Sequence, residues 1–276
     1  MRTAICISGH LRDFRDLSQN WFDMFLEPFR QYGRVDIFLH VWDELNSSDC
    51  FSVQQLDNVV NSNKLDEDYF RRLLNPTEMV VENFDQLKHN FTLDKYYKPG
   101  QRVHHLVYNH TSKIQYCFPM YYKWFQCNEL KKKKEKDENF KYDLVVKCRS
   151  DIFFFRKMWP EEFDPNYIYM RTPNQDFLIF GSSEGIDKVT SVYNNLRHII
   201  NTYQCDYTPE QLLEYHLQEN GLDHSKRRTF GEPSCWVYPR RFFAQACFDI
   251  LKRHGKEDQF YYIFNLYKKN LLKLNE

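Results

Sequence analysis

The most informative stretch of this chain reads Lys141-Tyr-Asp-Leu-Val-Val-Lys-Cys-Arg-Ser-Asp-Ile-Phe-Phe-Phe155. A charged run, 131–139, ends just before it, and residues 144–146 form a short apolar core. This pattern is typical of a strand that is buried on both faces, as in a parallel sheet. Two opposite charges, Arg149 and Asp151, follow the strand before apolar residues resume.

Asp151 is therefore the predicted centre of a functional site. In open α/β sheets, ligands bind beyond the carboxyl ends of the strands, where a carboxylate can hold a divalent cation or a sugar hydroxyl. The alternative is structural: Asp151 pairs with Arg149 or caps a turn, because ion pairs are common where strands end. Both interpretations place this carboxylate at the end of a central strand.

The composition limits the classes of function. The 276 residues are enough for one large domain, and 38 basic residues balance 38 acidic ones, so no global basic field favours nucleic acid as a partner. Aromatic residues make up 17% of the chain. Aromatic side chains suit sugars and bases as ligands, although an aromatic-rich core is the simpler explanation.

The cysteines and the hydropathy pattern indicate a location. None of the 8 cysteines forms a Cys-x-x-Cys pair, so neither a zinc knuckle nor a thioredoxin-like site is expected. We expect a reducing compartment without disulfides, which is the cytoplasm, or the host cytoplasm if the protein is viral. No secretory signal and no apolar window long enough for a transmembrane segment are visible.

Apolar periodicity and turn residues predict a series of strands and helices. The predicted strands are 3–8, 35–42, 78–82, 144–146, 167–170 and 177–181, and the predicted helices are 17–28, 114–124, 182–202, 209–220, 242–255 and 260–274. We expect Pro119 to kink or restart its helix. Residues 45–76 are expected to form a helical excursion, 84–109 mostly loop, and 131–139 a solvated helix end.

The order of these elements predicts the fold class. Strands and helices alternate over the first 150 residues, which favours a parallel, doubly wound α/β sheet. The second half is mixed and richer in helix. Because no linker separates the halves, we expect a single domain over 1–276, with halves at about 1–151 and 152–276.

Several enzyme classes are disfavoured by missing motifs. The first predicted strand is followed by Ser-Gly-His-Leu-Arg rather than by Gly-x-Gly-x-x-Gly, which disfavours dinucleotide oxidoreductases. The chain also lacks the P-loop motif Gly-x-x-x-x-Gly-Lys-Ser/Thr and the Gly-x-Ser-x-Gly nucleophile elbow. A nucleotide-binding α/β sheet with charged side chains at its strand ends remains.

Sugar transfer from a nucleotide donor has needs that these side chains can meet. Negative charge accumulates on the leaving diphosphate, so arginines or a divalent cation must neutralise it. The acceptor hydroxyl can require a carboxylate base within hydrogen-bond reach. The groups on offer are Arg12, Arg149, Asp151, Asp176 and Glu210.

Four motifs follow one another at characteristic separations. They are Ala4-Ile-Cys-Ile-Ser-Gly-His-Leu-Arg12, Asp36-Ile-Phe-Leu-His-Val-Trp42, Tyr142-Asp-Leu-Val-Val-Lys-Cys-Arg-Ser-Asp151 and Asp176-Phe-Leu-Ile-Phe-Gly181. Each motif is loose, but together they resemble a family of glycosyltransferases found in large DNA viruses of algae and in some bacteria and algae. The resemblance covers roughly residues 2–220 and implies a GT-A fold with a Rossmann-like nucleotide half and a mixed acceptor half.

The resemblance also implies a metal-binding Asp-x-Asp motif between the halves. It maps onto residues 149–151, where Asp151 matches the last aspartate and arginine replaces the first. Asp151 would hold Mn²⁺ or Mg²⁺ against the donor diphosphate. Because one of the usual two carboxylates is missing, this departure puts metal dependence in question.

The resemblance implies roles for further residues. The substrate-binding set comprises Ser8, Gly9, His10, Arg12, Trp42, Arg149 and Asp151. Ser8, Gly9 and Arg12 would line the nucleotide pocket, unless they form a plain turn with a surface arginine. Trp42 would stack near the base, unless it belongs to the core. A lone histidine such as His10 is more often structural than a ligand.

Two carboxylates are the candidates for catalysis on the acceptor side. Asp176 would face the acceptor or the transferred sugar, and its alternative role is to cap a turn. Glu210 could act from a helix start, where acids are ordinarily favoured by the helix dipole.

We therefore expect a glycosyltransferase that moves a sugar from a nucleoside-diphosphate sugar, a UDP-sugar by the resemblance, to a glycan hydroxyl. One alternative is a non-catalytic module that binds sugar or nucleotide on a degenerate transferase fold. Another is a nucleotidyltransferase, which would release pyrophosphate.

Overall fold

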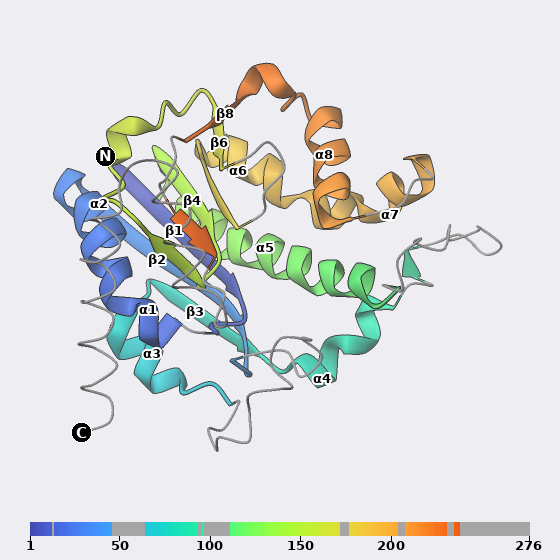
Figure 1. Cartoon of the computed structure of the whole chain (residues 1–276), viewed down its shortest axis with the longest axis horizontal. Coiled ribbons are helices and arrows are strands. Elements are labelled where there is room, and N and C mark those ends of the chain that lie inside the picture. Colours follow the sequence, from blue (N-terminus) through green and yellow to red (C-terminus); the bar gives the residue numbers. More distant parts are fainter. Residues whose placement is uncertain are drawn as a thin grey trace.

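A seven-stranded mixed sheet forms the centre of this computed structural model (Figure 1). The structure describes residues 1–12, 14–45, 64–92, 95–96, 111–171, 177–203, 208–230 and 235–237. Its strands are β1 Arg2–Gly9, β2 Arg34–Trp42, β3 Glu78–Glu82, β4 Leu144–Cys148, β5 Ile152–Phe154, β6 Ile168–Met170, β7 Leu178–Gly181, β8 Arg227–Thr229 and β9 Cys235–Val237.

Helices flank this sheet. The α-helices are α1 Phe14–Trp21, α2 Glu27–Tyr32, α3 Glu67–Leu74, α4 Phe84–Leu87, α5 Thr111–Asp137, α6 Ser183–Thr190, α7 Val192–Tyr203 and α8 Pro209–Glu219. A π-helical turn, η1 Phe22–Leu26, joins α1 to α2, and the 3₁₀ turns are η2 Lys88–Phe91, η4 Pro160–Glu162 and η5 His224–Lys226.

The strand order is β3-β2-β1-β4-β7-β6-β8. The pairs among β1, β2, β3 and β4 are parallel, whereas β7 runs antiparallel to both of its neighbours, β4 and β6. A separate two-stranded sheet pairs β5 with β9. The α/β class with a mostly parallel sheet is therefore confirmed, and one sheet runs through both halves of the chain.

The two faces of the sheet bury different side chains, because successive residues of a strand point to opposite faces. Ile5, Ile7 and Val146 belong to the core that packs beneath α1 and α2. Ala4 and Val145 belong to the core on the other face, beneath α5 to α8 (Figure 1). Apolar burial on both faces explains why the central strands are short apolar runs rather than alternating ones.

The connections around β1 create a switch point in the sheet. After β1 the chain passes through α1 and α2 on one face to reach β2, whereas β4 is entered from α5 on the other face. The strand order reverses between β1 and β4, and the segments that follow these two neighbouring strands lie together at the carboxyl edge of the sheet, where β5 packs against α1. The carboxyl ends of the strands at such a switch point are where open α/β sheets bind ligands.

Local signals explain the ends of two helices. The Ser182 hydroxyl accepts a hydrogen bond from the Gly185 N–H at 3.1 Å and caps α6. Thr208 and Gln211 form a reciprocal capping box at the start of α8, with Pro209 in the first turn. Beyond α8, Gly221 has a φ of 69°, the left-handed conformation that glycine adopts most readily. The predicted helix over 209–220 is confirmed.

Other expectations were wrong in detail. The helix predicted over 114–124 runs without interruption from Thr111 to Asp137, with Pro119 inside it. Proline costs this helix one backbone hydrogen-bond donor, but the burial of the neighbouring Phe118 and Tyr121 side chains compensates for the loss. The helix predicted over 182–202 divides at Ser191 into α6 and α7.

Two further segments, 84–109 and 131–139, also differ from the expectation. Within the segment 84–109, α4 and η2 are helical, and Asn83 caps α4 by accepting a hydrogen bond from the Gln86 N–H. The charged run 131–139 does include the end of α5, but Lys131 and Glu135 are buried rather than solvated. The helices predicted over 242–255 and 260–274 lie outside the described residues.

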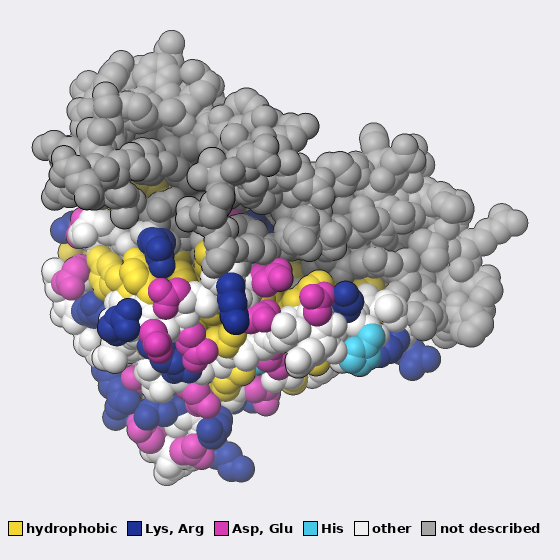
Figure 2. Space-filling model, turned by 90° about the horizontal axis from the view of Figure 1, so that it is seen from below, with side chains coloured by type: hydrophobic (Ala, Val, Ile, Leu, Met, Phe, Trp, Pro, Cys, Tyr) yellow, Lys and Arg dark blue, Asp and Glu magenta, His cyan; other side chains and the backbone are white. Residues whose placement is uncertain are grey.

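The surface of the described part mixes both signs of charge. Figure 2 shows Lys and Arg side chains interspersed with Asp and Glu over the face seen there. No helix in the described ranges is long and apolar enough to cross a lipid bilayer.

Candidate functional site

The loops after β1 and β4 are tied together at the switch point. The backbone turns away from β1 at Gly9, whose φ is 96°, and Arg12 has a φ of 40°. The Arg12 N–H donates to the Leu45 carbonyl oxygen at 2.8 Å, and the Ser150 hydroxyl donates to the His10 carbonyl oxygen at 2.8 Å. A non-glycine residue in the left-handed region is uncommon, so these tethers hold Arg12 in a disfavoured conformation.

Two arginines converge on one buried carboxylate. Arg149 donates from Nε to Oδ1 of Asp151 at 2.8 Å and from Nη2 to Oδ2 at 2.6 Å, a bidentate arrangement. Arg12 donates from Nη1 to Oδ2 of Asp151 at 2.9 Å. The side chain of Asp151 is 3% exposed, whereas Arg12 and Arg149 are 34% and 25% exposed. We call these three residues the arginine cluster.

The electrostatics of the arginine cluster favour an ionised Asp151. Burial alone would raise the pKa of this carboxyl, but the charges of Arg149 and Arg12 outweigh it and lower the pKa to about 2. The cluster thus carries two positive charges and one negative charge at pH 7. Its net positive charge reaches the surface through the two guanidinium groups.

The arginine cluster does not fit a divalent metal as it stands. Both oxygens of Asp151 already accept hydrogen bonds from guanidinium groups, and a cation would have to approach two positive charges. Within the described residues, no three or more His, Cys, Asp or Glu side chains gather in a group that could hold a metal ion. The role of Asp151 as a ligand of Mn²⁺ or Mg²⁺ stays a prediction.

His10 lies beside the arginine cluster as a neutral imidazole. Its Nδ1 is 3.0 Å from the Glu44 carbonyl oxygen, and because a carbonyl can only accept, Nδ1 carries the proton. Burial, opposed by this hydrogen bond and reinforced by the charge of Arg12, lowers the pKa of His10 to about 4. The Nε2 atom therefore keeps a lone pair at neutral pH.

The structure places Trp42 in the core, which was the alternative to stacking on a base. Its side chain is buried, the Tyr122 ring stacks at a centroid distance of 6.3 Å, and the ammonium of Lys123 lies 3.6 Å from its ring centroid. The predicted base-stacking role does not fit this position, because apolar packing already covers the indole. Ser8 is also buried, and its hydroxyl has no hydrogen-bond partner among the described residues.

Sequence reasoning missed an ion pair beside Trp42 in which the lysine is buried and the glutamate is 24% exposed. Lys123 is fully buried and donates from Nζ to the Val41 carbonyl oxygen and to Glu82 Oε2, both at 2.8 Å. Burial, partly offset by Glu82, lowers the pKa of Lys123 to about 8. The sequence did contain a signal for this buried lysine, because Lys123 stands between Tyr122 and Trp124 in an aromatic-rich helix segment.

The acceptor-side carboxylates are not brought together with the arginine cluster. Asp176 lies outside the described residues. Glu210 is exposed in the first turn of α8, where the Tyr121 hydroxyl donates to the neighbouring Pro209 carbonyl oxygen. No hydrogen bond or ion pair joins Glu210 to Arg12, Arg149 or Asp151 in the part of the chain that the structure describes. Both catalytic assignments stay predictions.

Comparison with known proteins does not assign this chain to a family. No protein-family model matches this sequence, and no curated protein is significantly similar to it.

Proposed function

We propose that this protein is a glycosyltransferase with a GT-A fold that moves a sugar from a nucleoside-diphosphate sugar to a glycan hydroxyl. The observation that carries the proposal is the arginine cluster at the switch point of the sheet. The resemblance described above names the donor class as UDP-sugars. Neither the fold class nor the composition could do so.

The arginine cluster supports the proposal through the charge of the leaving group. When the glycosidic bond to a diphosphate breaks, negative charge develops on the diphosphate oxygens. Arg12 and Arg149 present partly exposed guanidinium groups at the edge of the sheet where α/β proteins bind nucleotides. A guanidinium can donate two parallel hydrogen bonds to phosphate oxygens, which suits this charge.

In this proposal Asp151 is a positioning residue. Its carboxylate holds the Arg149 fork by two hydrogen bonds and Arg12 by one, so the two positive charges are arranged before the donor arrives. Preorganised charge needs no rearrangement during the reaction, which is the general source of electrostatic catalysis. We expect donor binding to depend on these arginines whether or not manganese is present.

Deprotonation of the acceptor remains with the predicted carboxylates. Asp176 is the first choice for the base and Glu210 the second, and His10 offers a neutral nitrogen lone pair as a third. A base must lie within hydrogen-bond reach of the acceptor hydroxyl. Turnover numbers measured with one acceptor distinguish these three candidate bases. The variants to compare are Asp176→Asn, Glu210→Gln and His10→Gln, and the variant that loses turnover identifies the base.

A second candidate function is a non-catalytic module that binds a nucleotide or sugar. The occupied carboxylate of Asp151 favours it, because the residue matching the metal-binding aspartate is engaged by two arginines. Both candidates require nucleotide binding at the arginine cluster, so binding alone does not distinguish them. Release of nucleotide from the donor does distinguish them, because only the transferase breaks the bond between sugar and diphosphate.

The test combines calorimetry of UDP binding with a nucleotide-release assay on a panel of nucleotide sugars. Each measurement is made with manganese and with EDTA. We expect UDP to bind in EDTA and free UDP to be released from at least one UDP-sugar, faster with a glycan acceptor.

Each contrary outcome has a distinct meaning. Binding without release from any donor would favour the non-catalytic module, and release of pyrophosphate would identify a nucleotidyltransferase. No UDP binding under either condition would overturn the proposal. Binding that requires manganese would restore the metal role of Asp151 and contradict the arginine-based site.

A further inference from the structure

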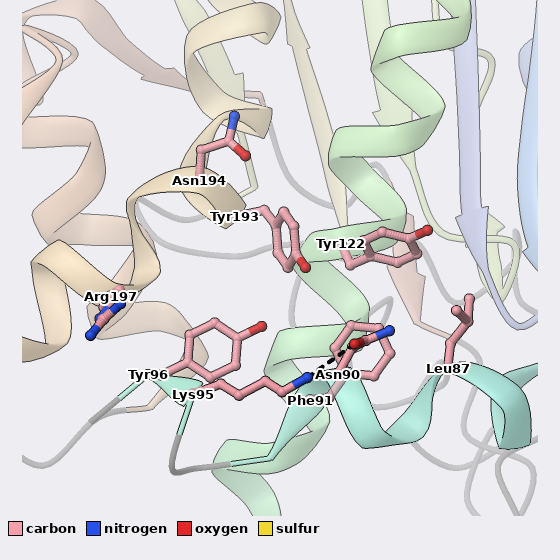
Figure 3. Close-up of a pocket in the computed structure, with 9 residues that line it drawn as sticks. All are labelled: Leu87, Asn90, Phe91, Lys95, Tyr96, Tyr122, Tyr193, Asn194 and Arg197. Carbon is pink, nitrogen blue, oxygen red and sulfur yellow. Dashed lines mark hydrogen bonds between the residues drawn. The ribbon is translucent and has the colours of Figure 1, made fainter. Parts of the chain in front are cut away.

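An aromatic pocket of about 420 Å³ lies beside the switch point, on the α5 face of the sheet (Figure 3). Five elements or segments contribute to its lining: α4, η2, residues 95–96, α5 and α7. The lining residues are Leu87, Asn90, Phe91, Lys95, Tyr96, Tyr122, Tyr193, Asn194 and Arg197. Its volume falls in the range of small-molecule sites.

The aromatic side of the pocket is built from interlocking rings. The rings of Tyr122 and Tyr193 meet edge to face at a centroid distance of 5.3 Å, and Phe91 packs 5.5 Å from Tyr122. Tyr96 stacks on Phe118 at 3.9 Å. Rings held in this way offer apolar faces to a ligand with little loss of side-chain freedom.

The polar side of the pocket is positively charged. Lys95 reaches across to the Asn90 side-chain oxygen at 3.0 Å, as Figure 3 shows, while Asn194 and Arg197 stand on α7. Among the described residues that line the pocket, none is an aspartate or a glutamate. Within the described residues, neither Lys95 nor Arg197 forms an ion pair with an acid. A ligand that carries negative charge would therefore meet two cations, and none of the described lining residues would oppose it with an acid.

The pocket is connected to the switch point by ring contacts. Tyr122 stacks over Trp42 at 6.3 Å, and Trp42 lies 6.4 Å from His10, which follows β1. The Tyr122 hydroxyl donates to Glu82 Oε1 at 2.9 Å, which fixes the ring against the end of β3. A ligand in the pocket would therefore lie on the same edge of the sheet as the arginine cluster.

We propose that this pocket is a saccharide subsite that binds an anionic sugar unit, such as a uronate, of the acceptor glycan. A sugar ring combines C–H faces, which pack on aromatic rings, with hydroxyls, which suit amides and phenols, and the pocket supplies both. Lys95 and Arg197 select the negative charge. The acceptor role rests on the proposed function, whereas the binding of the sugar does not.

The test measures binding of α-1,4-digalacturonate and of neutral α-1,4-galactobiose by ligand-observed NMR and calorimetry at millimolar concentrations. We expect the acidic disaccharide to bind more tightly to the full chain. Arg197→Gln should weaken binding of the acidic sugar by about three- to tenfold, the scale of a partly exposed charged hydrogen bond, and leave the neutral sugar unchanged.

Two further variants keep the test interpretable. Tyr193→Phe keeps the ring and should retain most binding, whereas Tyr193→Ala should lose both sugars. Arg72→Gln, the same change at an exposed arginine on α3, serves as the matched control and should bind like wild type. Failure of digalacturonate to bind, or equal weakening by Arg72→Gln and Arg197→Gln, would overturn the subsite.

Failure of the subsite and failure of the proposed function are separable. If digalacturonate binds through Tyr193 and Arg197 but no donor is turned over, the pocket stands and the transferase does not. If a UDP-sugar is turned over and the Tyr193→Ala variant uses every acceptor like wild type, the transferase stands and the pocket does not.

Discussion

Two clusters of charge lie at opposite edges of the same sheet, and they differ in how closed they are. At the carboxyl edge, the arginine cluster leaves Arg12 and Arg149 partly exposed. At the amino edge, Lys131 and Glu135 are 0% and 1% exposed. Lys131 donates to Ser183 Oγ at 2.6 Å and to Asp187 Oδ1 at 2.8 Å. We call this second group the lysine cluster.

The contrast separates a structural network from the proposed binding site. In the lysine cluster the central pair is closed to water, since Glu135 also accepts from the Tyr142 N–H at 3.0 Å and from Ser183 Oγ at 2.5 Å, whereas Asp187 at its edge is 25% exposed. The arginine cluster holds its carboxylate inside and turns part of its positive charge outward. A closed network stabilises the fold, whereas an outward-facing one can take up a ligand.

The largest effect is expected from opening the lysine cluster. Lys131→Met should lower the free energy of unfolding by about 3–5 kcal/mol, because Glu135 and Asp187 lose a buried partner. Urea denaturation measures this loss, and calorimetry at a temperature where the variant is folded should give an unchanged UDP affinity. A large loss of UDP affinity in the folded variant would erase the distinction between the clusters.

The next effect is expected at the arginine cluster. Arg12→Asn removes the guanidinium but tolerates the left-handed backbone at φ 40°. We expect UDP affinity to fall by about 1.5–3 kcal/mol, the scale of a hydrogen bond to a charged group. Because Arg149 still holds Asp151 by two hydrogen bonds, stability should change little.

Arg12→Lys is the matched control for that variant. It keeps the charge and loses the planar fork, so its UDP affinity should lie between those of Arg12→Asn and wild type. An Arg12→Asn protein that binds UDP like wild type, measured by calorimetry in EDTA, would remove Arg12 from the site.

Acid should weaken the arginine cluster in a defined window. The folded pKa of Asp151 is about 2, below its unfolded value, so its contribution to stability is complete above about pH 4 and is lost as the pH falls through 2. The shift corresponds to about 2 kcal/mol. The stability difference between wild type and Asp151→Asn should shrink over this window, and a difference that is constant from pH 5 to pH 2 would contradict the depressed pKa.

The smallest effect is expected at the rim of the lysine cluster. Lys141 is 69% exposed and pairs with Glu135 at 3.0 Å. Lys141→Ala should lower stability by less than about 1 kcal/mol, as exposed ion pairs do. Chemical denaturation of the Lys141→Ala and Lys131→Met variants compares their free energies of unfolding. Similar losses of stability in the two variants would show that burial does not decide how much these lysines contribute to stability.

Much of the fold was predictable from local pattern. The apolar runs at β1, β2 and β4 identify strands with two buried faces, and Thr208-Pro209 identifies the start of α8. These predictions succeeded because buried strands and helix caps depend on neighbouring residues. Lys131 and Glu135 were misjudged for the opposite reason: a charged run has the same composition whether it faces water or a buried partner.

The sequence by itself determined the residues at the candidate site. Arg12, Arg149 and Asp151 stand just after apolar strands, and that position is a property of the chain order. The pairing of Arg149 with Asp151, two residues apart, was foreseen as the structural alternative. Only the tertiary structure decided that β1 and β4 are neighbours, so that Arg12 reaches the same carboxylate across 139 residues of sequence.

The aromatic pocket and the core position of Trp42 likewise needed the folded chain. Tyr122 and Tyr193 come from helices far apart in sequence, and no local pattern encodes their edge-to-face contact. The physical reason is the same in each case. Local backbone preferences depend on adjacent residues, whereas burial, ion pairing and pocket shape depend on which surfaces long-range packing brings together.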